Sequence, residues 1–285
     1  MYGQRLCLGT SPDFKIPVEE QIALFKKSGF DGFFTGWTRE TPVSKYAAIA
    51  KELNMIYQSV HAPCWRIAGM WGDDEELARD IADELIDCLK SCAENGIPIM
   101  VSHAYIGFDD PDAAPNQKGL ERFKRVVDAA ENFGVKIAFE NTEGEQFLEA
   151  LINEFGNREC VGYCWDSGHE MCYSPSLDLL NKYGQHLIAT HINDNLGVKD
   201  FDGKIYWTDD LHLLPFDGIG DWDYNAERLD KCGYNGILTF ELKIHSKPDR
   251  HENDKYRAIP IESYIAECYA RACRFAAKRK IRQVK

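Results

Sequence analysis

Six short apolar runs in this chain each end on a residue type that commonly binds divalent metal ions. These runs end at His61, His103, Glu140, Asp166, His191 and Glu241, with His169 three residues beyond Asp166. A single ending of this kind is common in any protein. Six of them predict that the ends of the runs converge on one place in the fold and carry a divalent ion there.

The chain as a whole alternates between predicted strands and predicted helices. Residues 6–9, 32–35, 55–61, 97–103, 135–140, 161–166, 187–192 and 236–241 form eight apolar runs with the composition of buried strands. A helix is predicted over 74–95, with an apolar stripe and Gly96 as its stop. Another follows Pro115 and ends at Gly134, and a last one, over 261–279, ends in a basic tail that we interpret as a solvated helix end.

Alternating strands and helices imply parallel strand–helix–strand units. Eight repeats in 285 residues match an α/β fold of the (β/α)8 TIM barrel type. A doubly wound open sheet is the alternative, but its glycine-rich nucleotide fingerprint is absent after the first strand, where residues 9–12 are Gly-Thr-Ser-Pro. No linker divides the chain, so residues 1–285 are predicted to form one domain. In such a barrel the six strand ends would meet at one mouth.

Composition narrows the class of protein. A hydrophobic fraction of 44% can fill a core, and no run approaches 18 apolar residues, so no membrane span is expected. The ten cysteines include no Cys-x-x-Cys pair, and the first residues lack a signal-peptide pattern, so we expect reduced thiols in the cytoplasm. The net charge of −13 argues weakly against a nucleic acid partner.

The longest predicted loop, over residues 193–222, contains two further features. Asp210 and His212 stand two residues apart and form a plausible additional ligand pair. Gly218-Ile219-Gly220 is the only candidate for a phosphate cradle, and it is a weak one. Loops of this length in compact domains are usually functional or mobile.

The mixture of histidines and carboxylates suits Zn²⁺, Mn²⁺ or Co²⁺ better than Ca²⁺ or Mg²⁺, which prefer oxygen ligands alone. Because the set contains no thiolate, we expect a catalytic site with an open coordination position rather than a structural zinc site. His186, His245 and His251 lie outside this pattern and are expected to be hydrogen-bonded structural residues.

The chain resembles the xylose isomerase-like TIM barrel superfamily, which groups the sugar phosphate isomerase/epimerase family with AP endonuclease family 2 (endonuclease IV). The resemblance spans nearly the whole chain and lies in Ile137–Asn141, Trp165–His169, His191–Asp194, the Asp210-x-His212 loop and Phe240-Glu241. It implies one metal ion held by Glu140, Asp166, His191 and Glu241. It also implies that Glu140 and Glu241 act as base and acid through an enediolate, and that His169 hydrogen-bonds a substrate oxygen.

The endonuclease branch is the alternative that the resemblance leaves open. It holds three zinc ions, and its additional ligand positions correspond to residues that are all present here: His61, His103, His169, Asp210 and His212. That branch cuts abasic DNA and needs loops that enter the duplex, whereas residues 243–254 mix both charges and no loop interleaves Arg or Lys with aromatic residues. We therefore place a metal-dependent sugar isomerase or epimerase first and the phosphodiesterase second.

The expected substrate is a small, unphosphorylated ketose or related polyhydroxy carbonyl compound. Trp37, Trp65 and Phe108, on loops after the second to fourth strands, are candidates for the apolar walls of its site. A barrel that only binds a ligand would usually have lost part of the metal set, and none is lost here. The exact sugar, the metal and its number, and a possible homo-oligomer remain open at this stage.

Overall fold

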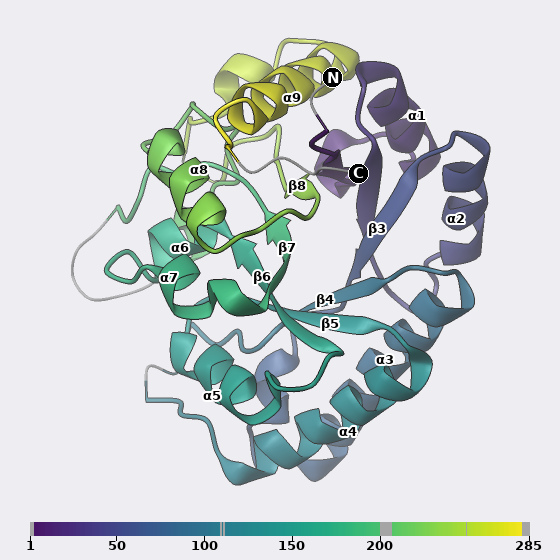
Figure 1. Ribbon diagram of the computed structural model, residues 1–285, viewed down its shortest axis with the longest axis vertical. Helices are drawn as coiled ribbons and strands as arrows, with labels where there is room; N and C mark the ends of the chain where they lie inside the picture. Colours follow the sequence, from purple (N-terminus) through teal and green to yellow (C-terminus); the bar gives the residue numbers. More distant parts are fainter. Residues whose placement is uncertain (1–2, 109, 111, 200–206, 249, 281–285) are drawn as a thin grey trace.

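The computed structural model of the protein describes residues 3–108, 110, 112–199, 207–248 and 250–280. Eight parallel strands follow one another around a barrel in the order β7-β6-β5-β4-β3-β2-β1-β8, and helices surround them (Figure 1). A bridge between Ile192 and Phe240 joins the two ends of the sheet. The fold is therefore the predicted (β/α)8 barrel.

All eight predicted strands are present. They span β1 Leu6–Gly9, β2 Gly32–Gly36, β3 Ile56–His61, β4 Ile99–His103, β5 Lys136–Glu140, β6 Val161–Asp166, β7 Leu187–His191 and β8 Leu238–Phe240. β8 is shorter than predicted, and Glu241 follows directly after its end. Glu241 is still held beside the barrel, because its N–H donates to the carbonyl of Ile192 at 3.3 Å.

The helices of the described segments include the three that the sequence predicts most clearly. They span α1 Val18–Ser28, α2 Val43–Glu52, α3 Glu75–Glu94, α4 Gln117–Phe133, α5 Glu145–Phe155, α6 Ser167–Tyr173, α7 Leu179–Tyr183, α8 Trp222–Lys231 and α9 Ile261–Ala276. Asp74 caps α3 by accepting the N–H groups of Glu76 and Leu77, each at 3.0 Å. Gly134 ends α4 in the left-handed conformation, with φ of 67°.

The end of α9 differs from its prediction as a solvated basic tail. The helix stops at Ala276, and the Arg279 side chain beyond it is fully buried. Its guanidinium forms an ion pair with Asp230 at 2.6 Å and donates to the carbonyl of Tyr234. Arg279 thus fastens the C-terminal segment to α8 and the turn that follows it. Residues 281–285 lie outside the described part of the chain.

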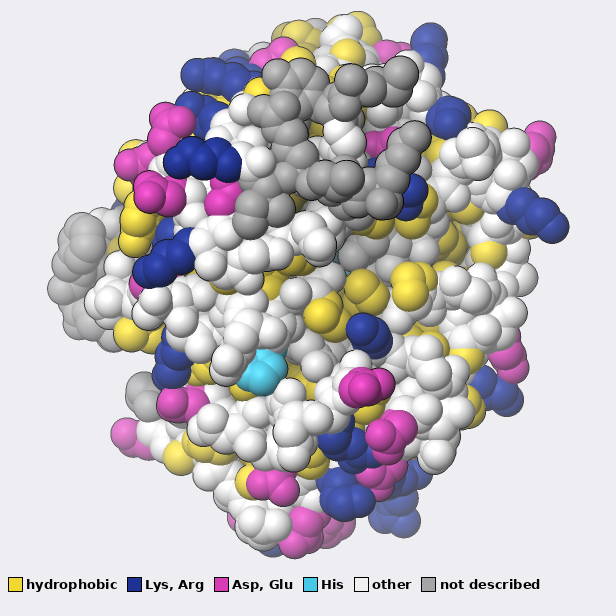
Figure 2. Space-filling model, in the orientation of Figure 1, with side chains coloured by type: hydrophobic (Ala, Val, Ile, Leu, Met, Phe, Trp, Pro, Cys, Tyr) yellow, Lys and Arg dark blue, Asp and Glu magenta, His cyan; other side chains and the backbone are white. Residues whose placement is uncertain are grey.

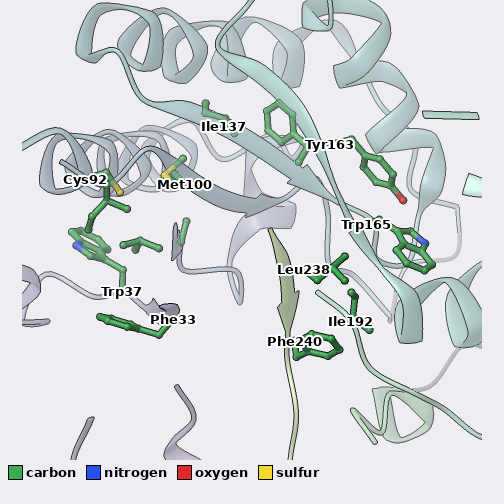
Figure 3. Close-up of a cluster of buried hydrophobic side chains, with 14 of the residues drawn as sticks. Phe33, Trp37, Cys92, Met100, Ile137, Tyr163, Trp165, Ile192, Leu238 and Phe240 are labelled. Atoms are coloured by element: carbon green, nitrogen blue, oxygen red, sulfur yellow. The ribbon is translucent and has the colours of Figure 1, made fainter. Parts of the chain in front are cut away.

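Alternate side chains of each strand serve two different layers. Large residues point outward and pack beneath the helices, among them Met100, Ile137, Tyr163 and Trp165 (Figure 3). The residues between them point into the barrel, where Val101, Ala138, Cys164 and Ala189 form a small cluster. Because the side-chain period of a strand is two, the next inward residue on each of these strands stands directly above this cluster. Those residues are His103, Glu140, Asp166 and His191.

Two further expectations concern the whole chain. All ten cysteines are free, as predicted, and seven of them are buried. No described helix has the length and apolar character needed to cross a membrane.

Acidic and basic side chains are interspersed on the face shown in Figure 2, so the net charge is not gathered into a single acidic patch there.

Candidate metal centre and active site

Four residues from four strand ends converge above the small interior cluster of the barrel. Glu140, Asp166, His191 and Glu241 each offer one ligand atom, and these atoms all lie within 4.8 Å of one another. His191 Nδ1 is 3.0 Å from Glu140 Oε1 and 3.1 Å from Glu241 Oε2. Glu140 and Asp166 are fully buried, whereas the Glu241 side chain is 27% exposed and faces the cavity above.

Two more histidines stand around the second oxygen of Glu140. His61 Nε2 lies 3.1 Å from Glu140 Oε2, and His103 Nε2 lies 3.3 Å from the same oxygen. His61 Nδ1 is 2.8 Å from the carbonyl oxygen of Ala62, a contact that fixes the orientation of the ring. His61, Glu140 and His191 therefore form a second group with metal-ligand spacing.

His169, Asp210 and His212 form the third such group among the described residues, and all three are buried. Asp210 Oδ2 lies 2.9 Å from His212 Nε2 and 3.6 Å from His169 Nε2. His169 is oriented by its Nδ1, which lies 2.8 Å from the carbonyl of Asn141. His212 has a φ of 52°, a left-handed conformation that costs a non-glycine residue free energy and that is common at functional sites.

Hydrogen bonds from outside the cluster fix the orientation of Asp166. Asn193 Nδ2 donates to both of its carboxylate oxygens, at 2.9 and 3.1 Å, and the N–H of His169 donates to Oδ1 at 2.7 Å. Asn141 holds the backbone on either side of the carboxylate, accepting the N–H of Asp166 and donating to its carbonyl, each at 2.8 Å. Such partners set ligand geometry in metal sites.

The electrostatics of the cluster fit a divalent cation. Burial opposes ionisation of Glu140 and Glu241, yet the neighbouring imidazoles hold both pKa values below their usual range. Burial raises the pKa of Asp166 to about 6, and the charge of Glu140 adds to that rise. Three carboxylates this close repel one another unless positive charge lies between them. The donor set and its spacing therefore suit Zn²⁺, Mn²⁺ or Co²⁺.

A cavity of about 640 Å³ opens above the cluster. Its wall includes five of the predicted site residues: His61, His103, His169, Asp210 and His212. Trp65 and Phe108 also line it, and Trp65 is 86% exposed. Trp37, predicted to be a third wall residue, lies instead in the hydrophobic core and does not line this cavity. Its ring is buried in the core cluster shown in Figure 3, and the sequence pattern alone does not distinguish such a position from one on the cavity wall.

Glu143 is a cavity residue that the sequence pattern did not reveal. Its Oε1 accepts the N–H of Gly107 at 2.6 Å, and its side chain lines the cavity between Thr142 and the β4–α4 loop. Burial raises the pKa of Glu143 to about 7. Its position three residues after Glu140 was the available signal, because the segment that follows a barrel strand forms the rim of the mouth.

The predicted phosphate cradle is already filled by a side chain of the protein. Gly218 and Gly220 donate their N–H groups to the Asp194 carboxylate, each at 3.0 Å. The N–H of Phe216 and the indole N–H of Trp222 also donate to it, each at 2.9 Å. The N–H groups of Gly218 and Gly220 are therefore occupied by a carboxylate of the protein and are not available to a substrate phosphate. Residues 200–206 of the same predicted loop lie outside the described part of the chain.

The three histidines expected to be structural take no part in the metal-ligand groups of the described residues. His245 Nδ1 lies 2.7 Å from Asp13 Oδ1, and His251 Nδ1 lies 2.9 Å from Asp254 Oδ2. His186 Nε2 lies 3.1 Å from Gln185 Nε2 at the other end of the barrel, before β7. The hydrogen-bonding role predicted for them agrees with these contacts.

Comparisons with known proteins agree with this architecture. The chain is 32% identical over 192 residues to the uncharacterized protein y4fM of Sinorhizobium fredii, and the match covers 62% of this chain but only 58% of that relative. The structure resembles that of the IolI protein with a bound zinc atom, with a TM-score of 0.75 and 18% identity over 96% of this chain and 99% of that one. It also resembles L-ribulose 3-epimerase, with a TM-score of 0.71 and 14% identity over 96% and 95% of the two chains.

A family model described as the xylose isomerase-like TIM barrel matches residues 22–260. That range begins in α1, ends just before α9 and contains every strand end of the cluster. The strand order and the matched range lead to the same assignment. The chain belongs to the xylose isomerase-like TIM barrel family.

Proposed function

We propose that the protein is a divalent-metal-dependent sugar isomerase or epimerase that acts on a ketose or a related polyhydroxy carbonyl compound. One observation carries this proposal: the ligand atoms of Glu140, Asp166, His191 and Glu241 lie within 4.8 Å of one another, and Glu241 lines a cavity of about 640 Å³. A cavity of this size suits a small molecule, because ligand sites typically measure roughly 300–1,000 Å³. The likeness to L-ribulose 3-epimerase supports the choice of a ketose.

Glu140, Asp166, His191 and Glu241 would hold one metal ion, with manganese, zinc and cobalt as the candidates. When bound, such an ion would polarise the adjacent oxygens of a ketose and stabilise the negative charge of an enediolate. The bound zinc atom named for the IolI protein supports the proposal that this chain also binds a divalent metal ion.

Glu241 is the carboxylate placed to exchange a proton with the substrate, because its side chain faces the cavity. Glu140 is the second member of the pair and lies at the floor, where His61 and His191 hold it ionised. In the proposed reaction one glutamate removes the proton next to the carbonyl and the other returns one from the opposite face. His169 Nε2 points to the cavity wall, where it can hydrogen-bond a substrate oxygen.

The test is turnover of a panel of ketoses by protein loaded with Mn²⁺, followed by exchange of the substrate C–H proton with deuterium from the solvent. The proposal predicts epimerisation or isomerisation of at least one ketose, with deuterium at the carbon next to the carbonyl. Absence of exchange across the panel with Mn²⁺, Co²⁺ and Zn²⁺ in turn would overturn it.

A second candidate function rests on a separate observation. The groups His61–Glu140–His191 and His169–Asp210–His212 provide ligand sets beyond the first, so the site has room for up to three ions. Several ions side by side suit metal-hydroxide attack on a phosphodiester, as in abasic DNA. Against this, Lys247 Nζ already lies 4.0 Å from Asp210 Oδ2 and places a positive charge beside the third group. Two or three bound zinc equivalents together with cleavage of an abasic duplex would favour this second function.

A further inference from the structure

We propose that the substrate carries an anionic group, a carboxylate or a phosphate monoester, and that the ammonium groups of Lys243 and Lys247 bind it. The inference rests on the proposed function, since it names the class of ketose that the same cavity accepts. Both lysines line the cavity, on the segment that follows β8. Neither belongs to the candidate metal-ligand groups.

Lys243 is held firmly in place by its backbone. Its N–H donates to the carbonyl of His212 at 3.0 Å. Its own carbonyl accepts hydrogen bonds from Asn253 Nδ2 at 3.0 Å and from the Tyr264 hydroxyl at 2.8 Å. Lys243 stands two residues after Glu241, and both side chains line the same cavity. No acidic side chain of the described residues forms an ion pair with its ammonium group.

Lys247 presents a second, more deeply buried ammonium group. Its side chain is only 12% exposed, and its Nζ donates to the carbonyl of Trp207 at 3.0 Å and lies 4.6 Å from the centre of that indole ring. The nearest carboxylate oxygen in the described structure, on Asp210, is 4.0 Å away.

The acids nearest to this pair have other partners, but Asp210 Oδ1 and Glu252 Oε2 have no hydrogen-bond partner in the described structure, and Glu252 Oε1 accepts the Lys247 N–H at 2.8 Å. Asp210 Oδ2 lies 2.9 Å from His212 Nε2. Both oxygens of Asp13 are used as well, because they accept the N–H groups of Ile244 and His245 and face the His245 ring at 2.7 Å. The only ion pair between these ammonium groups and a described carboxylate is the 4.0 Å one from Lys247 to Asp210, so the two positive charges in one cavity repel each other and burying them is costly. An anionic group on a ligand would remove both costs and form charge-assisted hydrogen bonds.

The backbone offers no competing anion site in the loop where the sequence suggested one. The N–H groups of Gly218 and Gly220 are occupied by Asp194. Lys243 and Lys247, together with the exposed Lys15, give the described cavity wall its positive charge. A ketose whose carbonyl end lies at the cavity floor would extend its far end toward this part of the wall.

The experiment compares three ketoses that share one carbon skeleton, binding to full-length protein loaded with Mn²⁺ and measured by titration calorimetry at constant ionic strength. D-Fructose is neutral, D-fructuronate carries a carboxylate, and D-fructose 6-phosphate carries a phosphate. The proposal predicts that at least one anionic ketose binds about tenfold or more tightly than D-fructose, as charge-assisted hydrogen bonds imply. Which of the two binds more tightly distinguishes carboxylate from phosphate.

The variants locate the source of that preference. Lys243→Met with Lys247→Met should bring the ratio of anionic-ketose to D-fructose affinity close to one, and the corresponding Arg substitutions should retain the preference. The matched control is Lys124→Met, which removes an exposed lysine paired with Asp128 on α4 and should leave the affinity ratio unchanged. If the double variant does not fold, the same comparison is made with each single Met variant. Equal binding of all three ketoses, or a preference that survives in the Met variants, would contradict the proposal.

Inorganic phosphate separates this inference from the proposed function. Phosphate binding by the wild-type protein that is lost in the Met variants would support the lysine subsite, even if no ketose is turned over. The lack of turnover would then count against the isomerase proposal alone. Turnover of neutral ketoses with no effect of the lysine variants on phosphate binding would leave the isomerase proposal standing and refute the subsite.

Discussion

His191 Nδ1 lies 3.0 Å from Glu140 Oε1, so a single imidazole nitrogen faces a fully buried carboxylate at the barrel mouth. The same nitrogen is 3.1 Å from Glu241 Oε2, and the ring stacks on Phe34 with 4.6 Å between the ring centres. The carboxylates hold the pKa of His191 well above its usual value even though burial opposes its charge. The cluster thus requires positive charge at this point, whether from a proton or from a metal ion.

Metal binding should therefore stabilise the fold. At a free metal concentration about 100 times its Kd, the free energy of unfolding should rise by about 2.7 kcal/mol. Thermal unfolding of the protein with Mn²⁺ and with excess chelator measures this difference. Asp166→Asn should abolish most of it, whereas Asp223→Asn, an exposed α8 residue paired with Lys278, should not. An equal response to metal in both variants would show that the ion binds elsewhere.

Glu241→Gln should abolish turnover and leave the fold intact. The amide has nearly the shape of the carboxylate but cannot accept a proton, and general acid–base catalysis typically contributes about 10²–10⁴-fold in rate. The matched control is Glu267→Gln, because Glu267 is on α9 and pairs only with Arg271 among the described ion pairs. Both variants should unfold within a few degrees of the wild type. Undiminished turnover in the Glu241 variant would remove the two-glutamate mechanism.

Glu143 predicts a pH dependence of stability. Its pKa is raised from 4.5 to about 7 because its carboxyl group is buried, so the folded state keeps a proton that the unfolded state has lost. This contribution is fully present below pH 4.5 and is lost as the pH rises through 7, with a size of about 3 kcal/mol. Glu143→Gln should remove it. Both proteins are unfolded with denaturant in the presence of chelator, from pH 4.5 to 8. As the pH rises, the free energy of unfolding of the wild type should fall relative to that of the variant. Parallel curves would contradict the raised pKa.

Asp194 should be a major source of stability in the β7–β8 connection. Its buried carboxylate accepts three backbone N–H groups and the indole N–H of Trp222. Asp194→Asn would turn an amide NH₂ toward these donors, at a cost of about 1–3 kcal/mol or more for each group left unpaired. Asp112→Asn, on the exposed β4–α4 loop, is a control with the same chemical change. Similar unfolding midpoints for both variants would refute this role.

Trp37 and Trp65 should behave in opposite ways. Trp37 is buried in the core, so Trp37→Ala should lower the free energy of unfolding by about 3–5 kcal/mol. Trp65 is 86% exposed at the cavity, so Trp65→Ala should leave stability within about 0.5 kcal/mol and weaken substrate binding. Chemical denaturation with a ligand titration on each variant separates the two effects. A large loss of stability in the Trp65 variant would place its ring against the core instead.

The strands and the inner cluster were predictable because both follow from a period of two. On four strands a small interior residue is followed two positions later by a ligand-type side chain, as at Ala138 and Glu140 or Ala189 and His191. That pattern is local and needs no knowledge of the loops. The predicted barrel places these strand ends at one mouth, whereas the set of four metal ligands was implied only by the resemblance to the family.

The rest of the site depends on loops, whose conformations the sequence pattern does not encode. Glu143, Lys243 and Lys247 reach the cavity because of backbone contacts made far along the chain, such as those from Gly107 to Glu143 and from Asn253 to Lys243. The burial of Trp37 and the filling of the glycine loop by Asp194 are likewise tertiary effects. These features depend on tertiary packing, which the local sequence pattern does not specify.

The most direct test of the central claim is a paired assay on one preparation of the protein. One half follows deuterium incorporation from solvent into a panel of neutral and anionic ketoses with Mn²⁺, and the other half follows cleavage of an abasic DNA duplex with Zn²⁺. The account predicts deuterium at the carbon next to the carbonyl of at least one ketose, its loss in Glu241→Gln, and an intact duplex. Cleavage of the duplex without exchange in any ketose would contradict it.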